Sequence, residues 1–471
     1  MDLDVAETRR ADRAWPLIRE ALAGSRRDLT AMPLSRAIFV LAVPMVLEMV
    51  MESVFAIADI FWVSKLGADA VAAVGLIESL LTVVYAIALG LAMGVGAVVA
   101  RRMGEQDPDA AARAAVQAVL LGLGLSGALG VAGVLFGPRL LVAMGATPAV
   151  VAVGGRCSQV LLGASVMPTL LFLINAAFRG AGDAAISMRT LWLANAINIG
   201  LGPLFVFGVG PFPRLGVTGA AVATTIGRGI GVLYLLVALG RGRGRLAVAR
   251  RHLRPDGETL RTILRVAKNG VVQTLIGFTS WIGLIRILSG FGSVALAGYT
   301  IAMRVVMFAL LPAVGLGNAA ATLVGQNLGA RDPARAEAAV WQAARYNLVF
   351  LGSLGLALIG AAPLVIRFFS AEAGVIAEGS RCLRVVGLGF GFYAYAIVMS
   401  QAFNGAGDTW TPTLINLGCF WLGEIPLAAL LARGLGLGPT GAYAAITAAF
   451  SVAAAVSVAL FKRGRWKTVR L

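Results

Sequence analysis

The chain has 471 residues, of which 59% are hydrophobic and only 13% are charged, and its mean hydropathy is +0.85. Soluble domains carry about 25% charged residues, so this composition excludes a soluble protein of this length. The excess apolar surface requires a lipid bilayer as its solvent, and we expect an all-α integral membrane protein. The net charge of +17 must be placed relative to that membrane before it indicates a partner.

Twelve stretches are long and apolar enough to cross a bilayer, since a helix needs about 20 apolar residues to span the hydrocarbon core. The predicted transmembrane helices cover residues 37–64, 71–100, 114–137, 157–178, 187–210, 216–239, 262–290, 294–325, 340–364, 382–404, 411–432 and 439–461. The segment that precedes them is polar and contains no apolar stretch typical of a signal peptide.

The first span carries three acids, Glu48, Glu52 and Asp59. At about 100° per residue, their spacing places all three on one narrow face of the helix. Each would cost about 2.5–3.5 kcal/mol near the bilayer centre, so we expect this face to point into the protein. Burial and mutual repulsion favour the protonated form of a carboxylic acid, which makes the three acids candidates for reversible proton or cation binding. The alternative is a static ion pair between Glu48 or Glu52 and an arginine at a helix end.

Polar residues in four further spans are candidates for a substrate pathway. They are Glu78 and Tyr85 in the second span, Asn195 in the fifth, Gln273 and Trp281 in the seventh, and Glu424 in the eleventh. Trp281 could stack on a cationic aromatic cargo, although packing is the alternative, and Asn195 could instead join two helices by a hydrogen bond. For Glu424 the alternative is an ion pair with Arg286 or Arg304.

Lys and Arg are distributed unevenly over the connections between the spans. With the N-terminus in the cytoplasm, both terminal segments and the basic run over 241–265 lie on the cytoplasmic side, and the other side carries only Lys65, Arg139, Arg214, Arg367 and Arg433. The positive charge therefore faces the anionic inner leaflet of the bilayer, and it gives no reason to expect a nucleic-acid partner.

An internal repeat divides the chain into two halves. MGEQDPDAAARAAVQA at 103–118 resembles LGARDPARAEAAVWQA at 328–343, and FRGAGD at 178–183 resembles FNGAGD at 403–408, both at an offset of 225 residues. The offset shortens to 222 between LGVTGA at 215–220 and LGPTGA at 437–442. Each half contains six spans that begin on the same side, so we expect two parallel six-helix lobes related by a pseudo-two-fold axis along the membrane normal, with a cleft between them.

The predicted organisation has five parts. They are a cytoplasmic N-terminal segment (1–36), an amino-terminal six-helix lobe (37–240), a cytoplasmic inter-lobe linker (241–261), a carboxy-terminal six-helix lobe (262–461) and a cytoplasmic basic tail (462–471).

Sites for catalysis, metals and cofactors are not indicated. The chain has three Cys and one His, and it contains no nucleophile elbow, no HExxH pattern and no phosphate-binding loop. We therefore expect neither an enzyme nor an ATP-driven pump, no catalytic residue, no metal site and no cofactor.

The twelve-span plan, the RGAGD and NGAGD turns, the GEQDP and GARDP loops and the LVGQNLGARDP segment together resemble the multidrug and toxic compound extrusion (MATE) family, over residues 36–463. The resemblance implies a secondary active exporter. It also implies that Asp59 matches the aspartate of the family's first span, and that Asn198 and Pro203 match an Asn-x-x-x-Asp-Pro motif in the fifth. Gly202 stands where that motif has its acid, and Glu48 or Glu52 could supply the missing carboxylate.

We accordingly expect a multidrug efflux antiporter of the bacterial inner membrane, with both termini in the cytoplasm. It would export small cationic or amphiphilic xenobiotics in exchange for H⁺ by alternating access, as a monomer, with Asp59, Glu48, Glu52 and Asn198 at the coupling site. Na⁺ as the coupling ion is one alternative. A flippase for lipid-linked saccharides of the same superfamily is another, although the acidic first span disfavours an anionic cargo.

Overall fold

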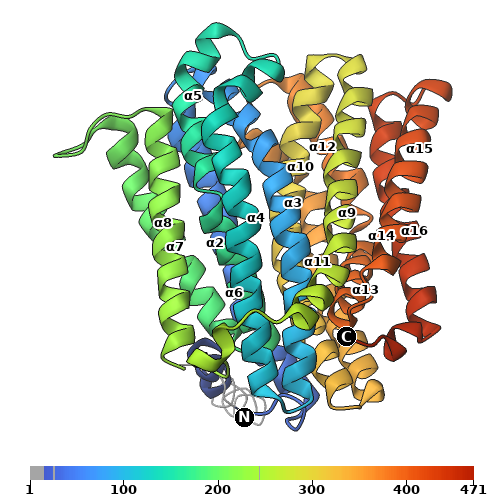
Figure 1. Ribbon diagram of the computed structural model, residues 1–471. Coiled ribbons are helices and arrows are strands. Elements are labelled where there is room, and N and C mark those ends of the chain that lie inside the picture. Colours follow the sequence, from blue (N-terminus) through green and yellow to red (C-terminus); the bar gives the residue numbers. More distant parts are fainter. Residues whose placement is uncertain (1–14, 25–26, 243) are drawn as a thin grey trace, which may run out of the picture.

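The computed structural model describes residues 15–24, 27–242 and 244–471, and within these ranges the chain is helical and contains no strand (Figure 1). Eleven of its helices or joined helices are long and apolar enough to cross a membrane, and a pair bent by 57° makes a twelfth. The prediction of an all-helical protein with twelve spans is thus confirmed.

The amino-terminal half begins with a short helix over residues 15–23. Its spans are α2 (Leu34–Ser64), α3 (Ala68–Gly104), α4 (Pro108–Ala143), the pair α5 (Pro148–Gly163) and α6 (Val166–Ala181), α7 (Ala184–Phe207) and α8 (Val217–Gly240). Each predicted span coincides with one of these to within three residues or falls inside it, and most observed helices extend beyond the predicted apolar stretch by several residues.

The carboxy-terminal half starts after a short 3₁₀ turn, Arg250–Leu253. Its spans are α9 (Gly257–Leu288), α10 (Ser293–Gly329), α11 (Pro333–Arg367), the bent pair α12 (Ala373–Gly387) and α13 (Phe390–Ala406), and α16 (Pro439–Lys462). The eleventh span is composite, because α14 (Trp410–Asn416) and α15 (Ile425–Ala429) alternate with π-helical segments at Leu417–Glu424 and Leu430–Gly434.

The duplication extends to the ends of the helices. Shifting the bounds of α3 by 225 residues gives those of α10, and shifting the bounds of α8 by 222 gives those of α16. The same local interactions start equivalent helices, because the Asp107 carboxylate accepts a hydrogen bond from the Ala110 amide at the start of α4, and Asp332 accepts one from the Arg335 amide at the start of α11. In both helices a proline occupies the first position, where no backbone donor is needed.

The two halves form two lobes that meet along matching helices. In one contact α2 packs against α10, and in the other α3 packs against α9. Because α9 is the counterpart of α2 and α10 that of α3, each contact maps onto the other, as a two-fold relation requires. Each lobe also has its own apolar core, around Ile174 and Phe178 in the first and around Tyr299 and Phe390 in the second.

Direct hydrogen bonds between the lobes gather in one half of the bundle. We call it the terminal end, because the helix at 15–23, the 241–256 connection and the C-terminus lie there, at the bottom of Figure 1. Gln326 donates to the Gly180 carbonyl (2.8 Å), Thr322 to the Arg179 carbonyl (3.2 Å) and Arg101 to the Ala406 carbonyl (3.3 Å). Among the described residues, no such bond joins the lobes in the opposite half.

Glycine allows the closest approach between the lobes. A Cβ added at Gly104 of α3 would lie 1.9 Å from the Gln326 carbonyl oxygen, and one at Gly329 would lie 2.2 Å from that of Arg101. Beneath this contact, Leu29 is fully buried, and Arg335 of the second lobe donates hydrogen bonds to the carbonyls of Leu29 and Met32. The terminal end is therefore sealed by backbone contact and by the segment that precedes α2.

Candidate functional site

The acidic face of α2 points into the amino-terminal lobe. Partners or close neighbours of Glu48, Glu52 and Asp59 come from helices of this lobe, namely α6 for the first, α7 and α8 for the second, and α5 and α8 for the third. The three acids share one face, as their spacing predicts, but they lie at different heights and have different surroundings.

Glu48 forms the most deeply buried ion pair of the described residues. Its side chain is 1% exposed, and its carboxylate Oε1 lies 2.6 Å from Nη1 of Arg179, at the end of α6. The other carboxylate oxygen, Oε2, is buried and accepts no hydrogen bond. A pair buried in this way has no direct route for proton exchange with water in this conformation, so Glu48 matches the static alternative more closely than the exchanging one.

Glu52 has a looser and more hydrated environment. Asn195 of α7 donates a hydrogen bond to its Oε2 at 3.0 Å, while Nη2 of Arg228 on α8 lies 3.9 Å from its Oε1. The Glu52 side chain remains 28% exposed. A charge pair at this distance is attractive but lacks a hydrogen bond, so either protonation or a competing cation can separate it.

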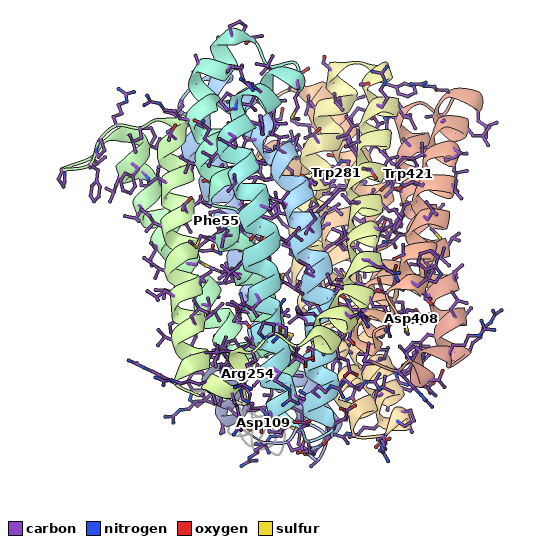
Figure 2. The ribbon with its side chains drawn as sticks, viewed as in Figure 1. Phe55, Asp109, Arg254, Trp281, Asp408 and Trp421 are labelled. Atoms are coloured by element: carbon purple, nitrogen blue, oxygen red, sulfur yellow. The ribbon has the colours of Figure 1, made fainter. Side chains whose placement is uncertain are left out.

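Arg228 is a central residue that the sequence analysis did not select. Its guanidinium lies over the rings of Phe55 (5.9 Å) and Tyr85 (5.6 Å) and donates a hydrogen bond of 3.4 Å to the Tyr85 hydroxyl; Phe55 is labelled within the amino-terminal lobe in Figure 2. It is the sole charged residue between Arg214 and Arg241. An arginine in mid-span requires an acid within reach, and that reasoning would have identified it.

Asp59 and Glu78 form the part of the site nearest the opposite end. Among the described residues Asp59 has neither an ion pair nor a hydrogen bond, but it lies within electrostatic range of Arg228, Glu78 and Cys157. Glu78 is exposed and interacts at longer range with Arg304 of the other lobe. Glu78 therefore lies within electrostatic range of both lobes.

Asn198 does not reach the acids of α2. It is buried and donates a hydrogen bond of 2.7 Å to the Thr224 hydroxyl on α8. The Trp62 ring occupies the space beside Gly202, where the family motif has its acid. A Cβ added at Gly202 would lie 3.4 Å from this ring. In this structure Asn195, rather than Asn198, donates a hydrogen bond to an acid of α2, Glu52.

The carboxy-terminal lobe has a neutral interior at the equivalent positions. Gln273, the counterpart of Glu48, is buried and donates to the Ser400 hydroxyl at 3.3 Å. Asn404, the counterpart of Arg179, lies with Gln273 on the wall of a cavity of about 190 Å³. Carboxamides thus replace the ion pair of the first lobe.

Trp281 and Glu424 lie at and inside the core of this lobe, the first partly buried and the second buried. Trp281, labelled in Figure 2, packs against the lobe core, and the Tyr299 hydroxyl lies beside its buried indole N–H. The alternative weighed for Glu424, an ion pair with Arg286 or Arg304, does not form. Glu424 is 3% exposed and makes no ion pair with a described residue, while both arginines are exposed. The arginines lie on the lobe surface and Glu424 lies inside.

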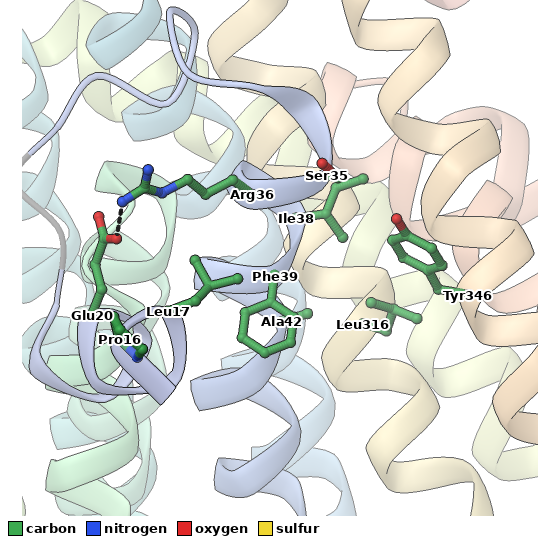
Figure 3. A pocket seen from close by; sticks show the side chains of 10 residues that line it. All are labelled: Pro16, Leu17, Glu20, Ser35, Arg36, Ile38, Phe39, Ala42, Leu316 and Tyr346. Atoms are coloured by element: carbon green, nitrogen blue, oxygen red, sulfur yellow. Dashed lines mark hydrogen bonds and ion pairs between the residues drawn. The ribbon is translucent and has the colours of Figure 1, made fainter. Parts of the chain in front are cut away.

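A further cavity lies apart from all these acids. It has a volume of about 810 Å³ and is lined by the helix at 15–23 and by α2, α10 and α11 (Figure 3). Its lining is mostly apolar, and its charged residues, Glu20 and Arg36, form an ion pair with each other. Its walls are Pro16, Leu17, Glu20, Ser35, Arg36, Ile38, Phe39, Ala42, Leu316 and Tyr346. This cavity therefore offers an apolar surface rather than a coupling site.

Comparison with known proteins gives one consistent result. The MatE family model matches residues 44–204 and 271–430, one match in each lobe. The probable multidrug resistance protein YoeA of Bacillus subtilis is 27% identical over 88% of this chain and 91% of its own length, and the FAD transporter of Shewanella oneidensis is 27% identical over 86% and 90%. A solved structure described as the outward-facing conformation of a multidrug resistance MATE family transporter of the MOP superfamily has a TM-score of 0.87 and 26% identity, and the match covers 93% of this chain and 97% of that one.

Proposed function

Because this chain belongs to the MatE family, whose members are membrane transporters rather than enzymes, we propose that it exports organic cations or amphiphiles in exchange for protons. We place it in the bacterial inner membrane as a monomer with both termini in the cytoplasm. Multidrug efflux is the activity named for relatives such as YoeA, and the choice of proton and cargo follows from the amino-terminal lobe.

One observation carries this proposal. The acids Glu52, Asp59 and Glu78 lie inside the amino-terminal lobe or within electrostatic range of both lobes, without a tight ion pair to any described residue, while hydrogen bonds close the lobes only at the terminal end. Acids in such positions can bind a cationic cargo or a proton, and one excludes the other. With the basic terminal end in the cytoplasm, the described conformation faces outward.

The proposed cycle uses this competition. A proton from outside binds Asp59 or Glu52 and removes the charge that holds a cationic cargo, so the cargo leaves to the outside. Protonation of Glu52 also removes its attraction for Arg228, 3.9 Å away, which allows α2 to shift against α8. The lobes then rock about the contacts of α2 with α10 and α3 with α9 to face inward, where the proton is released.

The driving force is sufficient for efflux. At a membrane potential of about 150 mV, one inward proton supplies about 3.5 kcal/mol. That energy corresponds to a gradient of about 300-fold for an uncharged amphiphile. Exchange of one proton for a monovalent cation moves no net charge and is driven by the pH difference alone, at about 1.4 kcal/mol per pH unit.

The direct test uses purified protein in liposomes with separately imposed proton and sodium gradients and a panel of cationic dyes. We expect dye export with the proton gradient alone and none with the sodium gradient alone. Export that persists under a sodium gradient after the pH gradient has been collapsed would replace proton coupling by sodium coupling.

Arg228 favours a second candidate cargo. Its guanidinium, flanked by Phe55 and Tyr85, is suited to an aromatic compound that carries an acidic group. The relative named FAD transporter moves a cargo of that kind. Export of FAD but not of cationic dyes from the same liposomes would support this candidate and exclude the first.

A further inference from the structure

Glu424 is a buried acid that the proposed cycle does not use. It ends the π-helical segment Leu417–Glu424, where this segment joins α15, and it is 3% exposed. No described residue forms a hydrogen bond or an ion pair with it. An ionised carboxylate left in that state would carry the full cost of its desolvation.

The groups around Glu424 come from several elements, and none of them is a cation. The hydroxyls of Tyr299 on α10 and Tyr393 on α13 lie within electrostatic range, together with Cys382 on α12 as a neighbour of both. Tyr443 on α16 stacks on Tyr299 at 6.3 Å. From α9 come the Trp281 indole and Gly283, which touches Ile425. Beyond Tyr443, Glu378 of α12 forms an ion pair with Arg381 at 2.7 Å, so these two residues together add no net charge.

Several of these groups lack a hydrogen bond of regular geometry. The hydroxyls of Tyr299, Tyr393 and Tyr443 and the indole N–H of Trp281 are buried without one, although Tyr299 lies beside Trp281, Tyr393 beside Thr447 and Tyr443 beside Glu378. Buried polar groups in proteins are nearly always paired, with protein or with water. A neutral carboxylic acid fits this environment, since it can donate to a tyrosine hydroxyl or to a water, whereas an ionised one has no cation to balance it.

The helix that carries Glu424 is irregular. Two π-helical segments flank α15, whereas the equivalent span of the other lobe, α7, is a continuous α-helix. Isolated π turns are rare and often mark functional sites. Conversion of one π turn to α changes the register by one residue, which rotates the following side chain by about 100° and would move the acid out of its present position.

We propose that Glu424 is a proton-binding site of the carboxy-terminal lobe, and that rewinding of the π-helical segment Leu417–Glu424 exchanges its proton with water. The bound form is the carboxylic acid, and the released form is the carboxylate with one proton given to water. The role of this site in transport rests on the proposed proton-coupled function. Proton binding by Glu424 does not, because it can be measured without transport.

Infrared spectroscopy of the purified protein tests the site itself. Near neutral pH we expect a carbonyl-stretch band of a protonated carboxylic acid that is lost in Glu424→Gln. The matched control is Glu372→Gln, which removes an exposed acid from the same lobe and should leave the band unchanged. The proposal is overturned if Glu424→Gln retains the whole band, or if addition of sodium at constant pH removes it, since the site would then bind Na⁺.

Transport in liposomes tests its use. We expect Glu424→Gln to bind cationic dye within about twofold of the unmodified protein and to lose at least about tenfold in proton-driven export, with Glu372→Gln unaffected. Unchanged export would overturn the coupling role. If the unmodified protein showed no proton-driven export at all, the proposed function would fail, while the infrared band would still report on Glu424.

Discussion

The two lobes share a backbone plan but differ in what they bury. Where the amino-terminal lobe has the ion pair Glu48–Arg179, the carboxy-terminal lobe has Gln273 and Asn404. Where the first places Arg228 between Phe55 and Tyr85, the second has a continuous aromatic cluster of Tyr393, Phe450 and Phe420. Matching helix ends and caps show that the scaffold tolerated this divergence, so charge in the first lobe is not needed to build a lobe.

We expect the largest loss of stability when the buried ion pair of the first lobe is disrupted. Arg179→Ala leaves Glu48 charged and unpaired, and we expect it to lower the free energy of unfolding by about 3–5 kcal/mol. The double variant Glu48→Gln with Arg179→Asn copies the side chains of the other lobe and should restore most of that loss. Unfolding in detergent measures both. Equal losses in the single and double variants would show that the pair is not a replaceable structural element.

The next largest effect is expected from a substitution at the glycine contact between the lobes. Gly104→Ala places a Cβ against the Gln326 carbonyl, and overpacking of this kind costs about 1–3 kcal/mol. Because the contact exists only when the terminal end is closed, we expect the inward-open state to become at least about tenfold more populated. Thiol labelling of a Leu29→Cys background measures this opening.

The control for that experiment is Gly352→Ala, since a Cβ at Gly352 meets no atom within 4 Å. Labelling that rises equally in Gly104→Ala and Gly352→Ala would reflect general loosening of the helices. Labelling unchanged in Gly104→Ala would show that the terminal end can absorb the extra atom without opening.

Replacement of Arg228 tests whether the charges of the first lobe determine its affinity for cations. Arg228→Phe gives the first lobe the residue that the second has at the equivalent position, Phe450. Loss of one positive charge beside Glu52 should raise the affinity for cationic dyes about tenfold, an effect of about 1.4 kcal/mol. Dye fluorescence titration measures it, with Arg286→Ala as the exposed control. A weaker affinity for the dyes in Arg228→Phe would instead assign Arg228 a role in holding the acids in place.

The smallest effects should be equal in the two lobes. Asp107→Ala and Asp332→Ala each remove the cap of an equivalent helix, and each should cost about 0.5–2 kcal/mol. Thermal unfolding in detergent compares them directly. If the two losses of stability differed by much more than that range, the lobes would be equivalent in backbone structure but not in stability.

The helices and the inward acidic face could be predicted from the sequence because hydropathy and spacing are local properties. The eleventh span was predicted, but its π-helical segments were not, because hydropathy does not distinguish a π turn from an α turn. Contacts between distant helices were harder still. Arg179 follows the predicted span 157–178 and was not identified as the partner of Glu48, and the arginines weighed as partners of Glu424 lie on the surface. The missing information in both cases was which neighbour lies within reach.

The most direct test of the coupling role of the α2 acids is proton-driven dye export by the double variant Asp59→Asn with Glu52→Gln. The control is Asp69→Asn, which removes an exposed acid at the start of α3. We predict that the double variant loses export under a proton gradient while the control retains it. Export at the rate of the unmodified protein in the double variant would contradict the account.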